Sequence, residues 1–156
     1  MSSYNILVVE NTPEPRIIAE ALEYIGHNVM VCTNLCDAEF YTCDNYQDEN
    51  AMPIDFILLD LTMNRRDLPK ELREEASEIP AGWVFYDKIL KVKNPILYKR
   101  TIFYTAYWES LKQLVDIDTY NSLNILPKNS DNLVTKAIEM MNSIIVMEAQ
   151  EGEGNE

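Results

Sequence analysis

The segment Ile54-Asp55-Phe56-Ile57-Leu58-Leu59-Asp60 is a mainly apolar run that ends abruptly in a carboxylate. Such a run is typical of a parallel strand buried on both faces of a sheet. Ligands and chemistry in open α/β sheets collect at the carboxyl ends of the strands. Asp60 is therefore the first candidate functional residue, as a nucleophile, a metal ligand or a polar residue that begins a loop.

Other short apolar runs alternate with stretches of helical periodicity along the chain. We expect further strands at residues 6–9, 29–32, 101–104 and 123–126, and helices at 17–25, 37–45, 83–92, 108–115 and 133–145, the last one capped by Ser130. Strands that alternate with helices favour a parallel sheet covered on both faces. The pattern predicts a flavodoxin-like, doubly wound α/β domain with helices on both faces of a five-stranded parallel sheet of order 2-1-3-4-5.

Composition narrows the function classes. The chain has 156 residues and a net charge of −13, which suits one domain at residues 1–147 and an acidic flexible tail at 148–156. The charge disfavours direct binding of nucleic acid through its phosphates. No long apolar segment predicts a membrane span or a signal peptide, so we expect a cytoplasmic protein. Three cysteines and the single His27, expected at the surface or as a helix cap, do not make a zinc site.

Polar residues follow four of the five predicted strands. Glu10 and Asn11 follow the first, Asp60 the third, Thr105 the fourth and Lys128 the fifth. If the strands are parallel, these residues meet at one edge of the sheet. An aspartate can accept a phosphoryl group as an acyl phosphate, and carboxylate and amide oxygens can hold the Mg²⁺ that such chemistry uses. The hydroxyl and the ammonium can then contact phosphoryl oxygens.

These residues resemble the receiver domain of two-component response regulators. Ile6-Leu7-Val8-Val9-Glu10-Asn11 is similar to its first strand and acidic pair, and Asp55-Phe56-Ile57-Leu58-Leu59-Asp60-Leu61-Thr62-Met63 to its phosphoacceptor strand. Thr105-Ala106 is similar to its switch threonine and small neighbour, Lys128 to its lysine, and Gly82 to the glycine that opens its third helix. The similarity covers nearly the whole chain.

The resemblance implies a single-domain response regulator in a phosphorelay. Asp60 would accept a phosphoryl group from a histidine kinase or a phosphotransfer protein, with Mg²⁺ held by Glu10, Asn11, Asp60 and the carbonyl of Thr62. Thr105 and Lys128 would contact the phosphoryl group. Any enzymatic activity would be limited to Mg²⁺-dependent self-phosphorylation and self-dephosphorylation. The output would be contacts with a downstream protein, with a homodimer as a further option.

The sequence departs from the family pattern at four places. Asn11 replaces an aspartate that binds the metal, Ile125 replaces an aromatic switch residue, and Asn129 replaces a proline after the lysine. A segment at about residues 62–81 is longer than the usual loop. These departures leave open a second interpretation, in which the chain is a pseudo-receiver that binds partners but is not phosphorylated.

Two enzyme classes with related folds or chemistry are disfavoured. A flavodoxin-type site for FMN needs a phosphate-binding loop rich in small residues after the first strand, whereas residues 11–15 contain no glycine. A phosphatase of the haloacid dehalogenase type would have an aspartate two residues after the nucleophile, where this chain has Thr62.

Overall fold

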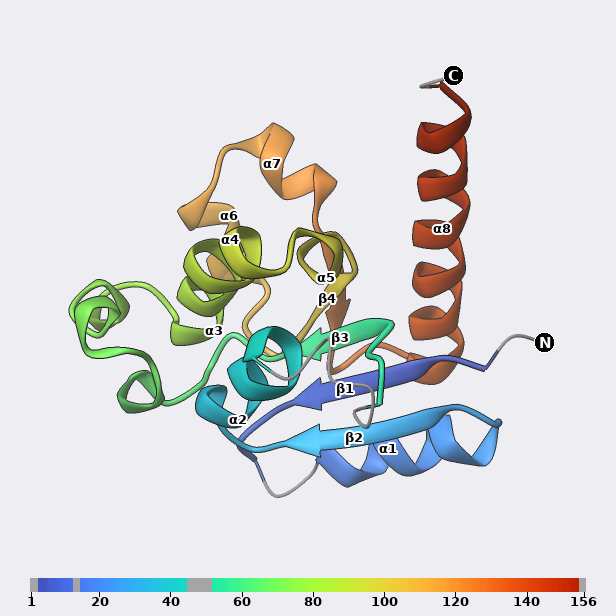
Figure 1. Cartoon of the computed structure of the whole chain (residues 1–156), viewed down its shortest axis with the longest axis horizontal. Helices are drawn as coiled ribbons and strands as arrows, with labels where there is room; N and C mark the ends of the chain where they lie inside the picture. Colours follow the sequence, from blue (N-terminus) through green and yellow to red (C-terminus); the bar gives the residue numbers. More distant parts are fainter. Residues whose placement is uncertain (1–2, 13–14, 45–51, 155–156) are drawn as a thin grey trace.

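A five-stranded parallel sheet forms the centre of the molecule (Figure 1). The computed structural model describes residues 3–12, 15–44 and 52–154. The strand order is β2-β1-β3-β4-β5, so the predicted fold class is confirmed. The strands are β1 (Asn5–Val9), β2 (Asn28–Cys32), β3 (Phe56–Leu59), β4 (Thr101–Thr105) and β5 (Asn124–Pro127).

Helices connect the strands. The α-helices are α1 (Pro15–Tyr24), α2 (Leu35–Glu39), α3 (Ala81–Val84), α4 (Lys91–Lys93), α5 (Pro95–Lys99), α6 (Glu109–Leu114), α7 (Ile117–Ser122) and α8 (Leu133–Gly154). Two π-helical segments, η1 (Phe40–Asp44) and η5 (Phe85–Leu90), continue α2 and α3. The five expected helices are present, whereas α5 and α7 were not predicted; each begins after an Asn or Asp side chain that accepts a hydrogen bond from the first turn. Of the described helices, none is both long and apolar enough to cross a membrane.

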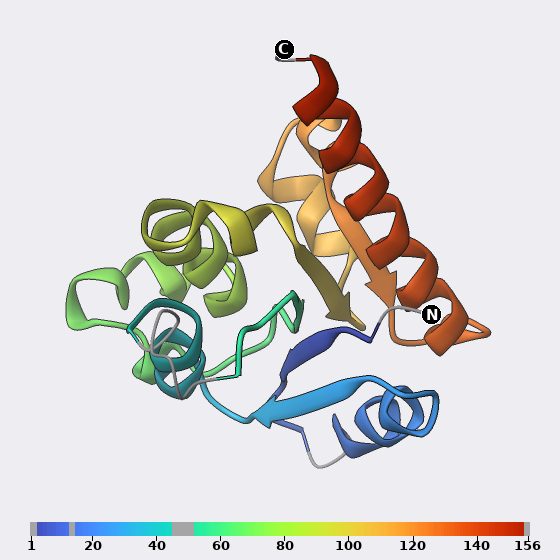
Figure 2. The same ribbon diagram turned by 45° about the vertical axis from the view of Figure 1, so that its right-hand side comes forward.

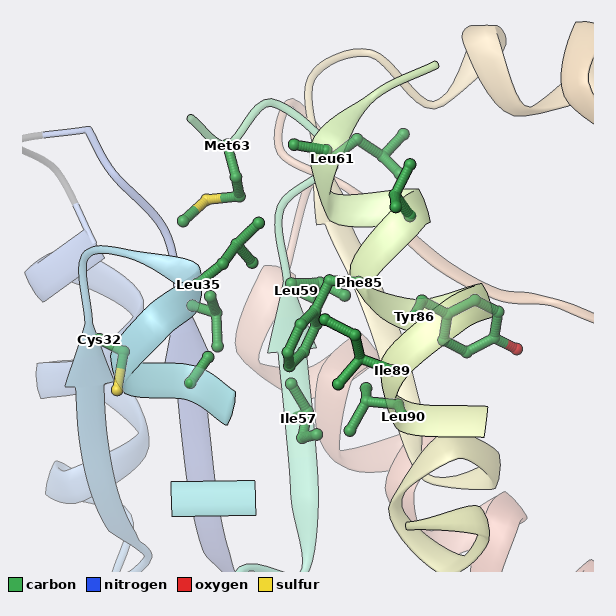
Figure 3. Close-up of a cluster of buried hydrophobic side chains, with 14 of the residues drawn as sticks. Cys32, Leu35, Ile57, Leu59, Leu61, Met63, Phe85, Tyr86, Ile89 and Leu90 are labelled. Carbon is green, nitrogen blue, oxygen red and sulfur yellow. The ribbon is translucent and has the colours of Figure 1, made fainter. Parts of the chain in front are cut away.

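Alternate residues of each strand pack into two separate cores. On one face of the sheet, Ile6, Val8 and Phe56 pack with residues of α1 and α8. On the other face, Leu7 and Leu59 pack with α2, α3 and η5, as Figure 3 shows for part of this cluster. Successive side chains of a strand point to opposite faces, so a strand covered on both sides must be apolar throughout. That requirement explains the uninterrupted apolar run before Asp60.

The last helix is longer than the sequence indicated. α8 begins at Leu133, so Ser130 lies before the helix and does not cap it, and its last turns extend through residues 148–154. The Arg100 guanidinium donates to both carboxylate oxygens of Glu148, at 2.9 and 2.8 Å. Residues 148–154 therefore continue a helix that Glu148 connects to Arg100, the residue directly before β4, instead of forming the expected flexible tail. Whether a domain boundary falls at residue 147 stays a prediction.

The segment between Asp60 and α3, residues 61–80, is called the β3–α3 insertion below. It forms three short 3-10 turns, η2 (Arg65–Asp67), η3 (Lys70–Leu72) and η4 (Glu75–Ser77). Leu61, Met63 and Leu68 are buried in the same core as Leu59. The insertion is therefore a packed part of the domain.

His27 is buried, which corrects its expected place at the surface. Its Nδ1 accepts a hydrogen bond from the backbone N–H of Tyr4 at 3.0 Å, and the two rings stack. This hydrogen bond requires an unprotonated Nδ1. Burial lowers the pKa of His27 below its ordinary value of 6.5. The folded protein therefore takes up this proton less readily than the unfolded chain does.

We predict that His27 makes folding less favourable in mild acid. As the pH falls through about 6.5, the unfolded chain gains a proton that the folded chain resists, so stability falls by at most about 1.4 kcal/mol per pH unit from this one group. Urea denaturation at about pH 7.5 and pH 5.5 measures the loss. His27→Asn keeps an acceptor but does not titrate, so its loss should be smaller. Equal losses in both proteins would contradict the prediction.

Candidate functional site

The carboxyl ends of β1, β3, β4 and β5 bring the predicted polar residues to one edge of the sheet. Backbone hydrogen bonds continue the strand pairing into these residues: the N–H of Asp60 donates to Val9 at 3.0 Å, and the N–H of Lys128 donates to Thr105 at 3.1 Å. Glu10 is held in the same way, because its N–H donates to Cys32 at 2.9 Å. The sheet itself therefore fixes where these side chains begin.

An ion-paired cluster of three side chains lies at this edge. The Lys128 ammonium is 3.0 Å from Oδ2 of Asp60 and also donates a hydrogen bond to Oε1 of Glu10. Both carboxylates are almost completely buried, each residue being only 2% exposed. Buried charges are stable only when they are paired and hydrogen-bonded. Lys128 provides that pairing for both carboxylates at once.

The environment of Lys128 favours its charged form. Burial by itself lowers the pKa of Lys128, but the hydrogen bonds to Glu10 and Asp60 and the charges of these groups outweigh it and raise the pKa above its ordinary value of 10.5. The ring of Tyr104 adds a cation–π contact, with its centroid 5.2 Å from the ammonium. Lys128 is therefore a permanent positive charge at this site.

The carboxylate oxygens of Asp60 and Glu10 differ in their further hydrogen bonds. Oδ1 of Asp60 accepts a hydrogen bond from the N–H of Thr62 at 3.2 Å. Oε1 of Glu10 also accepts one from the Thr12 hydroxyl at 2.6 Å, whereas Oε2 of Glu10 is buried without a hydrogen-bond partner. A buried, unpartnered carboxylate oxygen beside a second carboxylate suits a hard cation. The donor set thus fits Mg²⁺.

Among the described residues, only two acidic side chains, those of Glu10 and Asp60, are close enough to share a metal ion at this edge. Within the described ranges no group of three or more His, Cys, Asp or Glu side chains is arranged to hold a metal ion. A cation at this edge would rely on Glu10 and Asp60, with neutral oxygens from Asn11 and Thr62. Asn11 is exposed at the rim, so its amide is accessible to such an ion.

Thr105 is the last residue of β4. Its side chain is fully buried, and its hydroxyl oxygen accepts a hydrogen bond from the N–H of Tyr107 at 3.0 Å. Its neighbours Tyr104, Ala106 and Tyr107 line the open cleft, whereas Thr105 does not. The structure therefore brings Thr105 to the correct edge but below the surface of the cleft.

A cleft of about 600 Å³ opens above the cluster. It contains the predicted residues Glu10, Asn11, Asp60, Thr62 and Lys128. It is also lined by residues that we did not predict for the site: Thr12, Ile17, Tyr104 and Leu133. The Thr12 contact with Glu10 had no signal in the sequence, whereas Tyr104 was identifiable as the neighbour of Thr105 on β4.

Gly82 lies against the end of β3. A Cβ atom at residue 82 would be only 2.2 Å from the carbonyl oxygen of Asp60 and 2.8 Å from Cα of Leu61. The N–H of Gly82 donates to the carbonyl of Leu61 at 3.0 Å. Only glycine permits this approach. The start of α3 thereby supports the backbone that presents Asp60.

Comparison with solved structures agrees with this topology. A CheY-like response regulator receiver domain from Methanospirillum hungatei JF-1 matches with a TM-score of 0.59 and 17% identity over 94% of this chain and 99% of its own. The bacteriophytochrome response regulator AtBRR matches with a TM-score of 0.53 and 20% identity, over 91% of this chain and 94% of its own. The chain has the fold of a response-regulator receiver domain. No model of a known protein family and no curated protein matches the sequence.

The receiver fold accounts for the place of the cluster. In this fold, as in other open α/β sheets, the carboxyl ends of the strands form the edge where ligands bind. Ile125 is half-buried on β5 and packs against the core that contains Leu59. The described residues contain no cis peptide bond, so the Lys128–Asn129 bond is trans, as expected.

Proposed function

We propose that the chain is a response regulator that accepts a phosphoryl group on Asp60. The observation that carries this proposal is the pairing of one half-buried lysine with two buried carboxylates, Asp60 and Glu10, in the lining of a cleft. Asp60 lines the cleft although little of it is exposed, so a donor would approach it from there, and the ammonium is positioned to offset the charge of an incoming phosphoryl group.

In the proposed reaction, an oxygen of the Asp60 carboxylate attacks the phosphorus of a phosphohistidine on the donor protein. The new O–P bond forms as the P–N bond breaks, and the electron pair of the broken bond stays on the imidazole nitrogen. The Lys128 ammonium would donate a hydrogen bond to a phosphoryl oxygen. We propose that the hydroxyl of Thr105, whose oxygen accepts from the N–H of Tyr107, donates another.

Hydrolysis would return the site to its starting state. A water oxygen attacks the phosphorus, the bond between phosphorus and Asp60 breaks, and inorganic phosphate leaves. Mg²⁺, when bound, would neutralise charge on the phosphoryl oxygens. We propose Glu10, Asn11, Asp60 and the Thr62 carbonyl as its ligands. The neutral Asn11 implies a weaker affinity than an aspartate would provide.

Output is proposed through protein contacts on the face formed by α6, β5 and α8, together with α7, which follows α6. Ile117 on α7 and Val146 and Met147 on α8 are large apolar residues that are 66%, 54% and 61% exposed. Exposed apolar residues of this size fit a contact with a downstream protein or a second copy of the chain. We propose a cytoplasmic role, without direct contact to nucleic acid or to a membrane.

Intact-mass measurement after incubation with acetyl phosphate and Mg²⁺ tests the proposal. We expect an increase equal to one phosphoryl group in the wild-type protein and none in Asp60→Asn. Asp55→Asn is a matched control, because Asp55 begins the same segment at the opposite end of β3. It should still accept the group.

The second candidate function is a pseudo-receiver that binds partners without phosphorylation. Two observations favour it: Asn11 in place of an acidic metal ligand, and Ile125 in place of an aromatic residue. Absence of an adduct in the wild-type protein at saturating Mg²⁺ would support this function and contradict phosphorylation of Asp60. Asn11→Asp should increase Mg²⁺ affinity; unchanged affinity would remove residue 11 from the metal site.

A further inference from the structure

The β3–α3 insertion, which follows Asp60 in the chain, presents three arginines around one hollow. Arg65, Arg66 and Arg73 line a hollow of about 210 Å³ together with Glu74. The Nε of Arg73 donates to the carbonyl of Leu68 at 2.9 Å, which restricts the orientation of this guanidinium. Leu68 itself is 2% exposed and belongs to the core. The hollow is therefore built on a packed segment.

These arginines are not neutralised inside the molecule. All three are exposed, and in the part of the chain that the structure describes none of them forms an ion pair with a carboxylate. The chain has 26 acidic residues against 13 basic ones. In a protein with this excess of carboxylates, three grouped guanidinium groups without a carboxylate partner are available to an external anion.

The insertion lies at the same end of the sheet as Asp60. Figure 1 shows it as the light green segment beyond the arrowheads of β1, β2 and β3, and in Figure 2 the same segment lies beyond the arrowhead of β2. It starts directly after Asp60, and the N–H of Thr62 donates to Oδ1 of Asp60. A protein that reaches Asp60 to donate a phosphoryl group therefore arrives beside the insertion.

We propose that Arg65, Arg66 and Arg73 bind an acidic segment of the protein that donates the phosphoryl group to Asp60. The proposal rests on the proposed function. Guanidinium groups bind carboxylates through paired hydrogen bonds, and these three lie together on a molecule whose net charge of −13 would otherwise repel an acidic partner. The insertion would thus select a partner by charge, separately from the chemistry at Asp60.

Titration of the ¹⁵N-labelled full chain with a peptide of eight glutamates at low salt tests the binding surface. We expect shifts of backbone amide signals within the β3–α3 insertion. Arg65→Gln/Arg66→Gln should weaken binding at least about fivefold, because two of the three guanidinium groups are removed. The matched control Lys91→Gln/Lys136→Gln removes two exposed charges elsewhere and should weaken binding less than about twofold.

Three results would overturn this proposal. The first is that the peptide shifts amide signals only outside the insertion. The second is that the arginine variant binds the peptide as tightly as the control variant does. The third is that inorganic phosphate binds the hollow while the peptide does not. Incubation with acetyl phosphate, which needs no donor protein, distinguishes a failure of this proposal from a failure of the proposed function. The arginine variant should gain the phosphoryl group as the wild-type protein does, whereas failure of the wild-type protein to gain it contradicts only the role of Asp60.

Discussion

Replacing Lys128 with methionine should lower the free energy of unfolding at neutral pH by about 3 kcal/mol. Methionine fills much of the same volume but leaves Glu10 and Asp60 as two buried carboxylates without a cation. Removing one partner of a buried ion pair typically costs about 3–5 kcal/mol. We place the value at the lower end because the Lys128 side chain is still 21% exposed. Urea denaturation of the metal-free protein measures the change.

A double variant separates the loss of charge pairing from the loss of packing. Glu10→Gln in the Lys128→Met background removes one of the two negative charges, so it should recover a large part of the lost stability. Lys99→Met is a control for a lysine that is exposed on α5, and it should change stability by less than about 0.5 kcal/mol. If the urea midpoint of Lys128→Met equals that of the wild-type protein, the ion-paired cluster makes no net contribution to the free energy of unfolding.

Replacing Gly82 with alanine should destabilise the protein by about 3 kcal/mol or more. The new Cβ would lie 2.2 Å from the carbonyl oxygen of Asp60 and 3.0 Å from its carbonyl carbon. Both are backbone atoms at the end of a central strand, so they cannot move aside as a flexible side chain can. Overpacking in a core typically costs about 1–3 kcal/mol, and this contact is closer than cores tolerate. Thermal and urea denaturation measure the loss.

Gly152→Ala provides a control for this variant within the same chain. Residue 152 lies in α8, and a Cβ there would meet no atom within 4 Å. Alanine is favoured over glycine in a helix by about 1 kcal/mol, so this variant should be as stable as the wild-type protein or more so. Wild-type stability of Gly82→Ala would show that α3 does not press against the end of β3.

Much of the fold was predictable because buried parallel strands leave a strong signal. The runs at Ile6 and at Phe56 are apolar throughout, since both of their faces are covered. The alternation with helices predicts a parallel sheet, and the order 2-1-3-4-5 is that of the flavodoxin-like class. The elements that were missed are short. α5 and α7 have five and six residues, and their main signals in the sequence are the capping residues Asn94 and Asp116.

The sequence alone determined that Glu10, Asp60, Thr105 and Lys128 end four strands, because each follows an apolar run. Only the tertiary structure decided how they interact. Lys128 bridges the two carboxylates, Thr105 lies below the cleft, and Glu10 keeps one oxygen without a partner. The physical reason is that strand periodicity is local in the chain, whereas side-chain contacts depend on the register between strands. His27 and the β3–α3 insertion follow the same rule, since their burial depends on residues far away in the sequence.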